Sequence, residues 1–471
     1  MRYPLEPDHE DMHRLAQDVL DRAIAFVDRL AEHPASLAGV PEGEIRSLQR
    51  RLLQPPPEEP EKLAGILDRV EEASLAAVET AGPSYLAYIP GGGLFASALA
   101  DFYARATNRY VGMSATAPGL VALEWSIVRW LADIVGMPAQ GGGVLFSGGS
   151  IANFAAVVAA RERLGEAIAD GTVYLTEEAH QSVGKAVRLA GLPQGALRVV
   201  PCAKDLRMDV GALADMVAQD RQAGRRPFLV VAAAGTTNTG VIDPLPAVAD
   251  VAEREGLWFH VDAAYGGFFL LTKRGRAALR GIEQADSVTL DPHKSLFAPY
   301  GTGALVVRDL EALRAAHAVS GHYLQDLGEQ EVPDFADLGP ELTRELRGLR
   351  IWLPLHLYGV AAFRDALDEK LDLAQHAYLR LAAEPALELP WSPTLSIVAL
   401  RVRAADPNTA DALTRAVLER VNAGRRVFLS STVVEGRFTL RLAILAHRSH
   451  QGRVDEAVDA IIAAARTVTE G

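Results

Sequence analysis

The sequence predicts an α/β protein built on a largely parallel sheet of seven strands, with helices over both faces. From about residue 140, short runs rich in β-branched residues alternate with helical stretches, as in parallel strands joined by crossover helices. The length of 471 residues is also enough for about three domains. Strands are expected at residues 144–147, 173–176, 197–200, 228–233, 257–262, 287–290 and 304–307, and helices near 151–163, 180–191, 210–220 and 244–255.

The chain before this region is expected to form a helical arm, residues 1–82. Apolar residues recur at helical spacing in residues 12–30, and residues 61–80 are again helix-like. The proline-rich stretch at 54–61 cannot continue a helix, because proline lacks an amide donor and restricts the residue before it. Such an arm needs another surface on which to bury its apolar stripes.

A small α+β domain, residues 361–471, is expected after a large domain at residues 83–360. Its elements are an alternating strand at 395–402, a hairpin-like pair at 426–434 and 438–445, and a last helix near 453–467.

Composition limits the classes of function. The formal net charge of −13 argues against non-specific nucleic-acid binding. Cys202 is the single cysteine, so no disulfide forms within the chain and a reducing, cytoplasmic location is expected. No uncharged apolar run reaches the roughly 18 residues of a membrane span. No metal site is expected, and we expect a solvated strand and loop for the basic residues Arg437, Arg441, His447 and His450.

Residues that follow the strands are the candidates for chemistry, because parallel sheets bind ligands at the carboxyl ends of their strands. The turn at 146–150 contains Gly149 and Ser150, and its glycines and free N–H groups could hold a phosphate. An ordinary tight turn is one alternative. A hydrolase nucleophile elbow is another, although Ala152 stands where that motif requires glycine.

Two further strands end in charged residues. Asp262 could pair with a protonated ring nitrogen, or could be a helix cap or a carboxylate at the edge of the core. Lys294 ends a buried strand, where desolvation could lower the pKa of its amine, as an imine-forming nucleophile needs. His293 beside it could equally be structural.

His180 and Thr237 follow two more strands. His180 could stack on a flat ring or move a proton, and Thr237 could offer a hydroxyl; a histidine at a helix end and a polar loop are the alternatives. Five strand ends thus present an anion cradle, a stacking ring, a hydroxyl, a carboxylate and a lysine. This combination predicts a pocket for pyridoxal 5′-phosphate (PLP).

The sequence resembles the group II PLP-dependent amino-acid decarboxylases, the family of the aromatic-L-amino-acid, glutamate and histidine decarboxylases. The resemblance runs from about Pro83 to Tyr358 and rests on the runs H-V-D-A-A-Y at 260–265, P-H-K at 292–294, A-H-x-S-V at 179–183 and R-G-L-R-I-W at 347–352. It implies the type I, aspartate-aminotransferase-like fold. It also implies a homodimer with active sites at the subunit interface and the N-terminal arm packed on the partner.

By this resemblance, Lys294 forms the internal aldimine with PLP, Asp262 pairs with the pyridine nitrogen and His180 stacks on the ring. The other cofactor-binding residues that it implies are Gly149, Ser150 and His293 at the phosphate, Thr237 near the 3′-oxygen, and Ala264.

The implied reaction converts an L-amino acid to the amine and carbon dioxide through an external aldimine and a quinonoid, with Asp262 keeping the ring an electron sink. Tyr323 opens an acidic stretch, residues 321–341, whose composition is typical of a mobile loop. It matches the family's proton-donating tyrosine. Relatives that make aldehydes carry phenylalanine there, so tyrosine favours decarboxylation.

The substrate is expected to be aromatic or large and apolar. Tyr88 and Gly91 lie where the family builds its side-chain pocket, and so do Val111 and Met113, which the neighbouring subunit would supply. Met113 replaces a phenylalanine of the aromatic decarboxylases and leaves a roomy, deformable pocket. Asp291 replaces their asparagine, and a carboxylate beside a phosphate is unfavourable unless it meets a cation.

Four other functions stay open. An aldehyde synthase or a transaminase of the same fold would differ in its products. A serine hydrolase would use Ser150, Asp262 and His293. A cofactor-binding or structural relative without turnover would form the chromophore only, and the intact set of Lys294, Asp262, His180 and Tyr323 argues against it.

Overall fold

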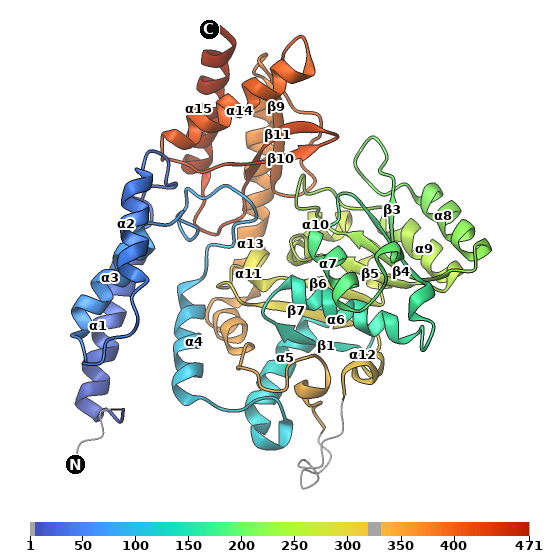
Figure 1. The fold of residues 1–471 in the computed structure, drawn as a ribbon, viewed down its shortest axis with the longest axis horizontal. Helices are drawn as coiled ribbons and strands as arrows, with labels where there is room; N and C mark the ends of the chain where they lie inside the picture. The colour runs from blue at the N-terminus through green and yellow to red at the C-terminus, as the bar shows by residue number, and fades with distance from the viewer. Residues whose placement is uncertain (1–4, 319–330, 471) are drawn as a thin grey trace.

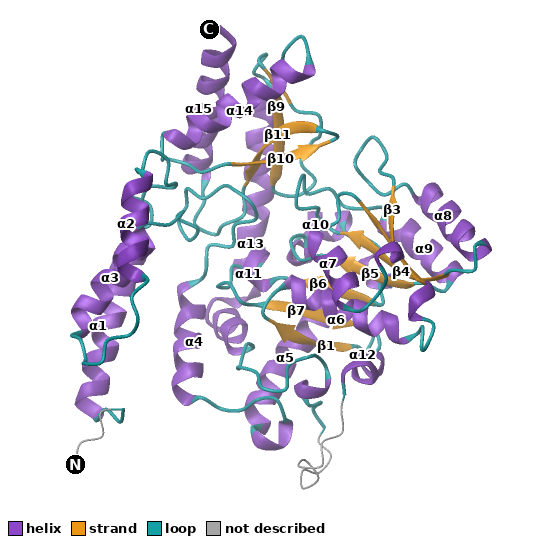
Figure 2. Ribbon diagram, in the orientation of Figure 1, coloured by secondary structure: helices purple, strands orange, loops and turns teal. Residues whose placement is uncertain are grey.

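Among the residues that the computed structural model describes, 5–318 and 331–470, seven strands form one sheet in the order β1-β7-β6-β5-β4-β2-β3 (Figures 1 and 2). All of them except β7 run in one direction. The predicted, mainly parallel α/β sheet is therefore confirmed. The strands are β1 (Gly142–Phe146), β2 (Gly171–Thr176), β3 (Leu197–Val200), β4 (Arg226–Ala233), β5 (Trp258–Asp262), β6 (Ser287–Leu290) and β7 (Gly303–Val307).

Helices cover both faces of this sheet, and the chain direction decides which face each one takes. The helices α6 (Gly149–Glu162) and α7 (Gln181–Leu189) lead from β1 towards β3, whereas α8 (Val210–Gln222) and α9 (Leu245–Glu255) lead back. Right-handed crossovers place the two pairs on opposite faces. Every residue of β1 and β2 is buried, which explains why neither strand contains a charged residue.

A second, antiparallel sheet has the strand order β10-β11-β9-β8. The predicted hairpin is present, and its turn at Glu435 and Gly436 has a positive φ at both residues. The strands are β8 (Leu387–Glu388), β9 (Ile397–Val402), β10 (Ser430–Val434) and β11 (Arg437–Ala443). The helices around this sheet are α13 (Leu349–Ala382), α14 (Pro407–Ala423) and α15 (Gln451–Glu470).

The N-terminal helices α1 (His9–Asp28), α2 (Glu42–Leu52) and α3 (Leu63–Leu75) stand along one side of the molecule (Figure 1). None of the three has a buried residue, although Val19, Ile24 and Val70 on them are apolar. The sequence pattern did not predict α2. None of the helices in the described ranges is both long and apolar enough to cross a membrane.

A buried ion pair joins α5 (Pro118–Val135) to the segment that precedes α13. Glu124 of α5 lies 2.5 Å from Arg344, and both side chains are at most 1% exposed. The second oxygen of Glu124 accepts a hydrogen bond from the Gly348 amide at 2.8 Å. A Cβ atom on residue 348 would lie 2.7 Å from the Glu124 Cα, so this close approach requires glycine. Arg347 reaches the carbonyl oxygen of Leu145 in β1 at 3.2 Å.

Replacing Glu124 should therefore destabilise the fold. Glu124→Ala leaves the Arg344 guanidinium buried without its carboxylate, which should lower the free energy of unfolding by about 3–5 kcal/mol. Urea unfolding followed by circular dichroism measures this change. The control is Glu42→Ala, which removes an exposed pair with Arg46 and should cost at most about 1 kcal/mol. Equal, small losses in both variants would contradict the importance of the buried pair.

Candidate active site

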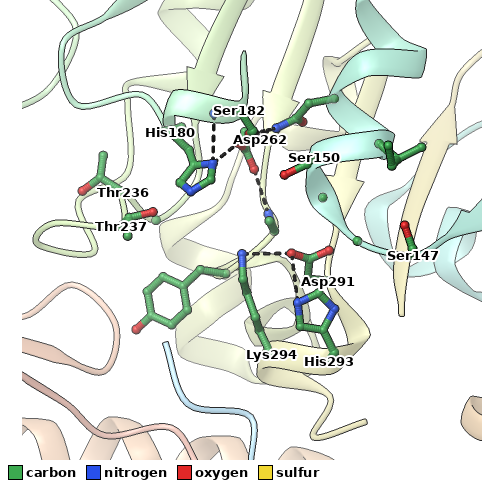
Figure 3. A pocket seen from close by; sticks show the side chains of 18 residues that line it. Ser147, Ser150, His180, Ser182, Thr236, Thr237, Asp262, Asp291, His293 and Lys294 are labelled. Carbon is green, nitrogen blue, oxygen red and sulfur yellow. Dashed lines mark hydrogen bonds and ion pairs between the residues drawn. The ribbon is translucent and has the colours of Figure 1, made fainter. Parts of the chain in front are cut away.

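A cavity of about 370 Å³ opens at the carboxyl edge of the large sheet (Figure 3). Residues that follow β1, β2, β4, β5 and β6 form its walls. The lining includes all of the residues predicted to bind the cofactor, namely Gly149, Ser150, His180, Thr237, Asp262, Ala264, His293 and Lys294. The fold thus brings together side chains that are up to 145 positions apart in the sequence.

The turn between β1 and α6 forms one end of the cavity. α6 begins at Gly149 and is 14 residues long, so its first N–H groups lie at the cavity and provide partial positive charge. Close packing explains why residues 149 and 303 are glycines. A Cβ on residue 149 would lie 2.9 Å from an Asp291 oxygen, and a Cβ on residue 303 would lie 2.4 Å from the Gly148 Cα. Together with Ser150, this turn could hold a phosphate.

Asp262 ends β5 with its carboxylate directed at the cavity (Figure 3). One oxygen accepts a hydrogen bond from Asn153 Nδ2 at 2.9 Å, and the other accepts one from the Ala264 amide at 3.2 Å. A carboxylate held in this way can bind a protonated ring nitrogen.

His180 precedes α7 and caps its first turn. Its Nδ1 accepts a hydrogen bond from the Ser182 amide at 3.3 Å and lies 2.7 Å from the Ser182 hydroxyl. Because a backbone N–H can only donate, Nδ1 carries no proton and the neutral ring is protonated at Nε2. Burial lowers the pKa of His180 against the opposing effect of Asp262, which favours this neutral form.

Lys294 forms an ion pair with Asp291, with 2.9 Å between Nζ and Oδ2. Burial acts to lower the pKa of the Lys294 amine, but the charges of Asp291 and Asp262 and the hydrogen bond to Asp291 outweigh it, so the pKa is raised. The expectation of a lowered pKa is therefore wrong for the free amine. The cation that Asp291 requires is Lys294 itself, while the other Asp291 oxygen is buried and has no hydrogen-bond partner among residues 5–318 and 331–470.

The hydrolase alternative finds no support in the geometry. The Nδ1 atom of His293 lies 2.6 Å from the carbonyl oxygen of Thr302, to which it can only donate. Asp262 is bonded to Asn153 and Ala264 instead of to His293. Within the described ranges, Ser150, His293 and Asp262 thus form no proton-transfer chain of the serine-hydrolase type.

Arg441 is buried, contrary to the expectation of a solvated side chain. It is 2% exposed, and burial lowers its pKa to about 10. Its guanidinium donates to the carbonyl oxygens of Thr237, Asn238 and Tyr88 and thereby ties β11 to two segments beside the cavity. His450, by contrast, is exposed and pairs with Glu369.

The residues predicted to form the substrate pocket lie outside the cavity lining in the described parts of one chain. Val111 is fully buried and Met113 is 8% exposed. Gly91 packs against the backbone of the lysine motif, because a Cβ there would lie 2.0 Å from the His293 carbonyl oxygen. Tyr88 is exposed and has a positive φ of 51°. Tyr323 lies outside the described residues.

Asn153 and Ser182 were not singled out from the sequence. Asn153 is one of few polar residues in the helix run S-I-A-N-F-A-A-V-V-A-A, and a lone amide in an apolar helix is the signal that could have identified it. Both line the cavity and bond to predicted site residues.

The residues present fit PLP. The turn at Gly149 offers N–H groups to a phosphate, Asp262 offers a carboxylate to a ring nitrogen, and His180 adds a neutral imidazole. Lys294 supplies a primary amine whose Nζ atom lies in the same cavity (Figure 3).

Comparisons with known proteins agree with this geometry. Residues 46–403 match the model of the "Pyridoxal-dependent decarboxylase conserved domain". Aromatic-L-amino-acid decarboxylase of Bacillus atrophaeus is 31% identical over 450 residues, which cover 93% of this chain and 92% of the relative. Phenylacetaldehyde synthase of Arabidopsis thaliana is 28% identical and aligns with 96% of this chain and 95% of its own.

Solved structures show the same similarity. The crystal structure of Oryza sativa TDC with PLP and tryptamine superimposes with a TM-score of 0.92 at 28% identity, and the match covers 99% of both chains. This agreement confirms the fold that the resemblance implied. The chain belongs to the pyridoxal-dependent decarboxylase family.

Proposed function

We propose that the protein is a PLP-dependent carboxy-lyase that converts an aromatic L-amino acid to its amine and carbon dioxide. The observation that carries the proposal is the convergence of Lys294, Asp262, His180 and the Gly149 turn on one cavity. The similarity to an aromatic-L-amino-acid decarboxylase and to a structure holding PLP and tryptamine supports the same conclusion.

The residues have distinct roles in this proposal. Bound PLP supplies an electron sink for the electron pair that remains on the substrate when carbon dioxide leaves. Lys294 attaches the cofactor, and Asp262 holds a proton on its ring nitrogen. His180 presents Nε2–H towards the reacting groups, because Ser182 occupies Nδ1. The N–H groups at the start of α6, Ser150 and His293 hold the phosphate, and Thr237 and Ala264 line the same space.

A homodimer would complete the site. The helices α1, α2 and α3 bury none of their residues, and Phe102 and Tyr103 on α4 (Phe95–Thr107) are each 63% exposed. Large apolar surfaces of this kind mark protein–protein contacts. We infer that a second copy covers them and that its Val111 and Met113 segment, with Tyr88 and Gly91, shapes the substrate pocket. The half-buried free thiol of Cys202 suits a reducing, cytoplasmic location.

The aldehyde-synthase alternative depends on Tyr323. The relative named phenylacetaldehyde synthase is about as similar in sequence as the Oryza sativa TDC structure, so overall identity does not separate the two reactions. A tyrosine at position 323 favours protonation of the substrate carbon and release of the amine.

Carbon dioxide release tests the proposed function. Purified protein loaded with PLP, incubated with each amino acid in turn, should release carbon dioxide with aromatic L-amino acids. Lys294→Ala should abolish both turnover and covalent attachment of PLP, because no other amine lines the cavity in the described residues. Borohydride trapping and mass spectrometry measure the attachment. Lys204→Ala changes an exposed lysine and should keep both properties. Steady-state carbon dioxide release by Lys294→Ala would refute the assignment.

Tyr323→Phe should lower the yield of amine and raise that of aldehyde, because the proton donor is lost. Chromatography of the products, with ammonia and peroxide assays, measures the ratio. Tyr358→Phe, at an exposed tyrosine of α13, is the control and should leave the ratio unchanged. Unchanged amine output in Tyr323→Phe would remove Tyr323 from the mechanism.

Asp291→Asn should lower the pKa of the Lys294 amine, because it removes the nearest opposing charge. Attachment of PLP requires the unprotonated amine, and a lower pKa increases that fraction at any given pH. The rate of attachment to apo-protein should therefore rise at neutral pH, by about tenfold each time the pKa of the amine falls by one. Stopped-flow absorption across a pH series measures it.

The matched control for this experiment is Asp205→Asn, which neutralises an exposed carboxylate away from the cavity. It should leave the pH midpoint of attachment unchanged. A midpoint that stays constant or moves to higher pH in Asp291→Asn would contradict the role of the ion pair.

A further inference from the structure

A single buried amide connects the two side chains that would flank the cofactor ring. Asn153 of α6 is 1% exposed. Its Nδ2 donates to Asp262 Oδ2 at 2.9 Å and to the Ser182 hydroxyl at 3.0 Å. The Ser182 hydroxyl in turn lies 2.7 Å from His180 Nδ1. Asn153 is thus the shared partner of Asp262 and, through Ser182, of His180.

The other end of the amide is held from behind the cavity. Asn153 Oδ1 accepts from the Thr289 hydroxyl at 2.7 Å and lies 3.0 Å from His260 Nε2. His260 Nδ1 lies 2.8 Å from Ser287 Oγ, which accepts from Trp258 Nε1 at 2.7 Å. These residues of β5 and β6 are at most 2% exposed. Water therefore does not compete for the hydrogen bonds that lead from Trp258 to Asn153.

The hydrogen bonds that lead from Trp258 to Asp262 have only one consistent order of donors and acceptors. The Trp258 indole can only donate, and the Asp262 carboxylate can only accept. Asp262 therefore requires the amide nitrogen of Asn153, which turns Oδ1 towards His260 Nε2 and requires a proton on that ring nitrogen. The unprotonated Nδ1 of His260 then accepts from the Ser287 hydroxyl, which also accepts from Trp258. Burial lowers the pKa of His260 to about 4, so the ring is neutral and carries one proton.

The reversed direction fails at Asn153. If His260 were protonated at Nδ1, its Nε2 would have to accept, and the Asn153 amide would have to turn its nitrogen towards it. The amide oxygen would then face the Asp262 carboxylate, and two acceptors without a proton between them would be buried together. The orientation of Asn153 is therefore set from both sides.

We propose that Asn153 is a positioning residue for the PLP-dependent reaction, because it holds the Asp262 carboxylate and the Ser182–His180 pair in one fixed arrangement. The inference rests on the proposed function. Thr289 and His260 hold the amide oxygen of Asn153, and Ser287 and Trp258 support the ring of His260. Correct alignment of Asp262 with the ring nitrogen then depends on residues that never touch the cofactor.

The test replaces the amide nitrogen while keeping the size of the side chain. Asn153→Leu removes both donors to Asp262 and Ser182 and adds no charge beside Asp262. Loss of a hydrogen bond to a charged group should weaken PLP binding by about tenfold to a hundredfold. With ring-¹⁵N-labelled PLP, the nitrogen signal should move towards the unprotonated position. In the apo-protein, the ¹⁵N signals of His180 should show a mixture of tautomers. The fall in activity should lie in kcat more than in KM.

A second variant tests the same role if the first one does not fold. Trp258→Phe keeps an aromatic ring but removes the donor that starts the chain, so it should shift the same ¹⁵N signals in the same direction by a smaller amount. The matched control is Tyr174→Phe, which removes a buried hydrogen bond of 2.6 Å from Tyr174, in β2 of the same sheet, to Asp220 of α8. It should lower stability and leave all of these signals unchanged.

The outcomes separate this inference from the proposed function. If wild-type protein neither binds PLP nor releases carbon dioxide, the proposed function fails. If the wild type does both, and the variants at Asn153 and Trp258 match the Tyr174→Phe control in PLP affinity and in the ¹⁵N signals, the positioning role of Asn153 is overturned.

Discussion

The shared direction of β1, β2, β4, β5 and β6 is the constraint on which the site depends. Each strand delivers the residues that follow it to the same edge of the sheet, so a distance in sequence becomes a short distance in space. β7 runs the other way and contributes its start, where Gly303 packs against Gly148 and narrows the phosphate end. A strand reversed within this set would remove one wall of the cavity.

The net charge of the whole protein does not determine which charges the cavity can bind. The formal net charge is −13, and two carboxylates, Asp262 and Asp291, line the same space as one lysine. A phosphate can still be held there, because the start of α6 offers N–H groups that carry partial positive charge without a basic side chain. Asp291 is compensated by Lys294 at 2.9 Å rather than by the bulk of the protein.

Local patterns predicted the strand ends, and therefore the cavity residues that follow them. They failed where a property depends on contacts across the chain. The Lys294 pKa is raised because the Asp291 side chain turns back on it, and the sequence does not specify that rotation. Asn153 acquires its importance from Asp262, which lies 109 positions away. Arg441 is buried only because Thr237 and Tyr88 supply carbonyl oxygens around it.

Two features of the isolated chain are incomplete, the packing of its N-terminal arm and the lining of its cavity. A second copy of the chain would complete both. The arm of α1, α2 and α3 has apolar residues but buries none, and the described residues that line the cavity include no large apolar wall for an aromatic side chain. Glycine, serine, threonine and charged groups dominate that lining and suit a phosphate and a ring nitrogen. In the proposed dimer, the surface that stabilises the assembly and the surface that selects the substrate are formed by the same association, so selectivity becomes a property of the pair rather than of one chain.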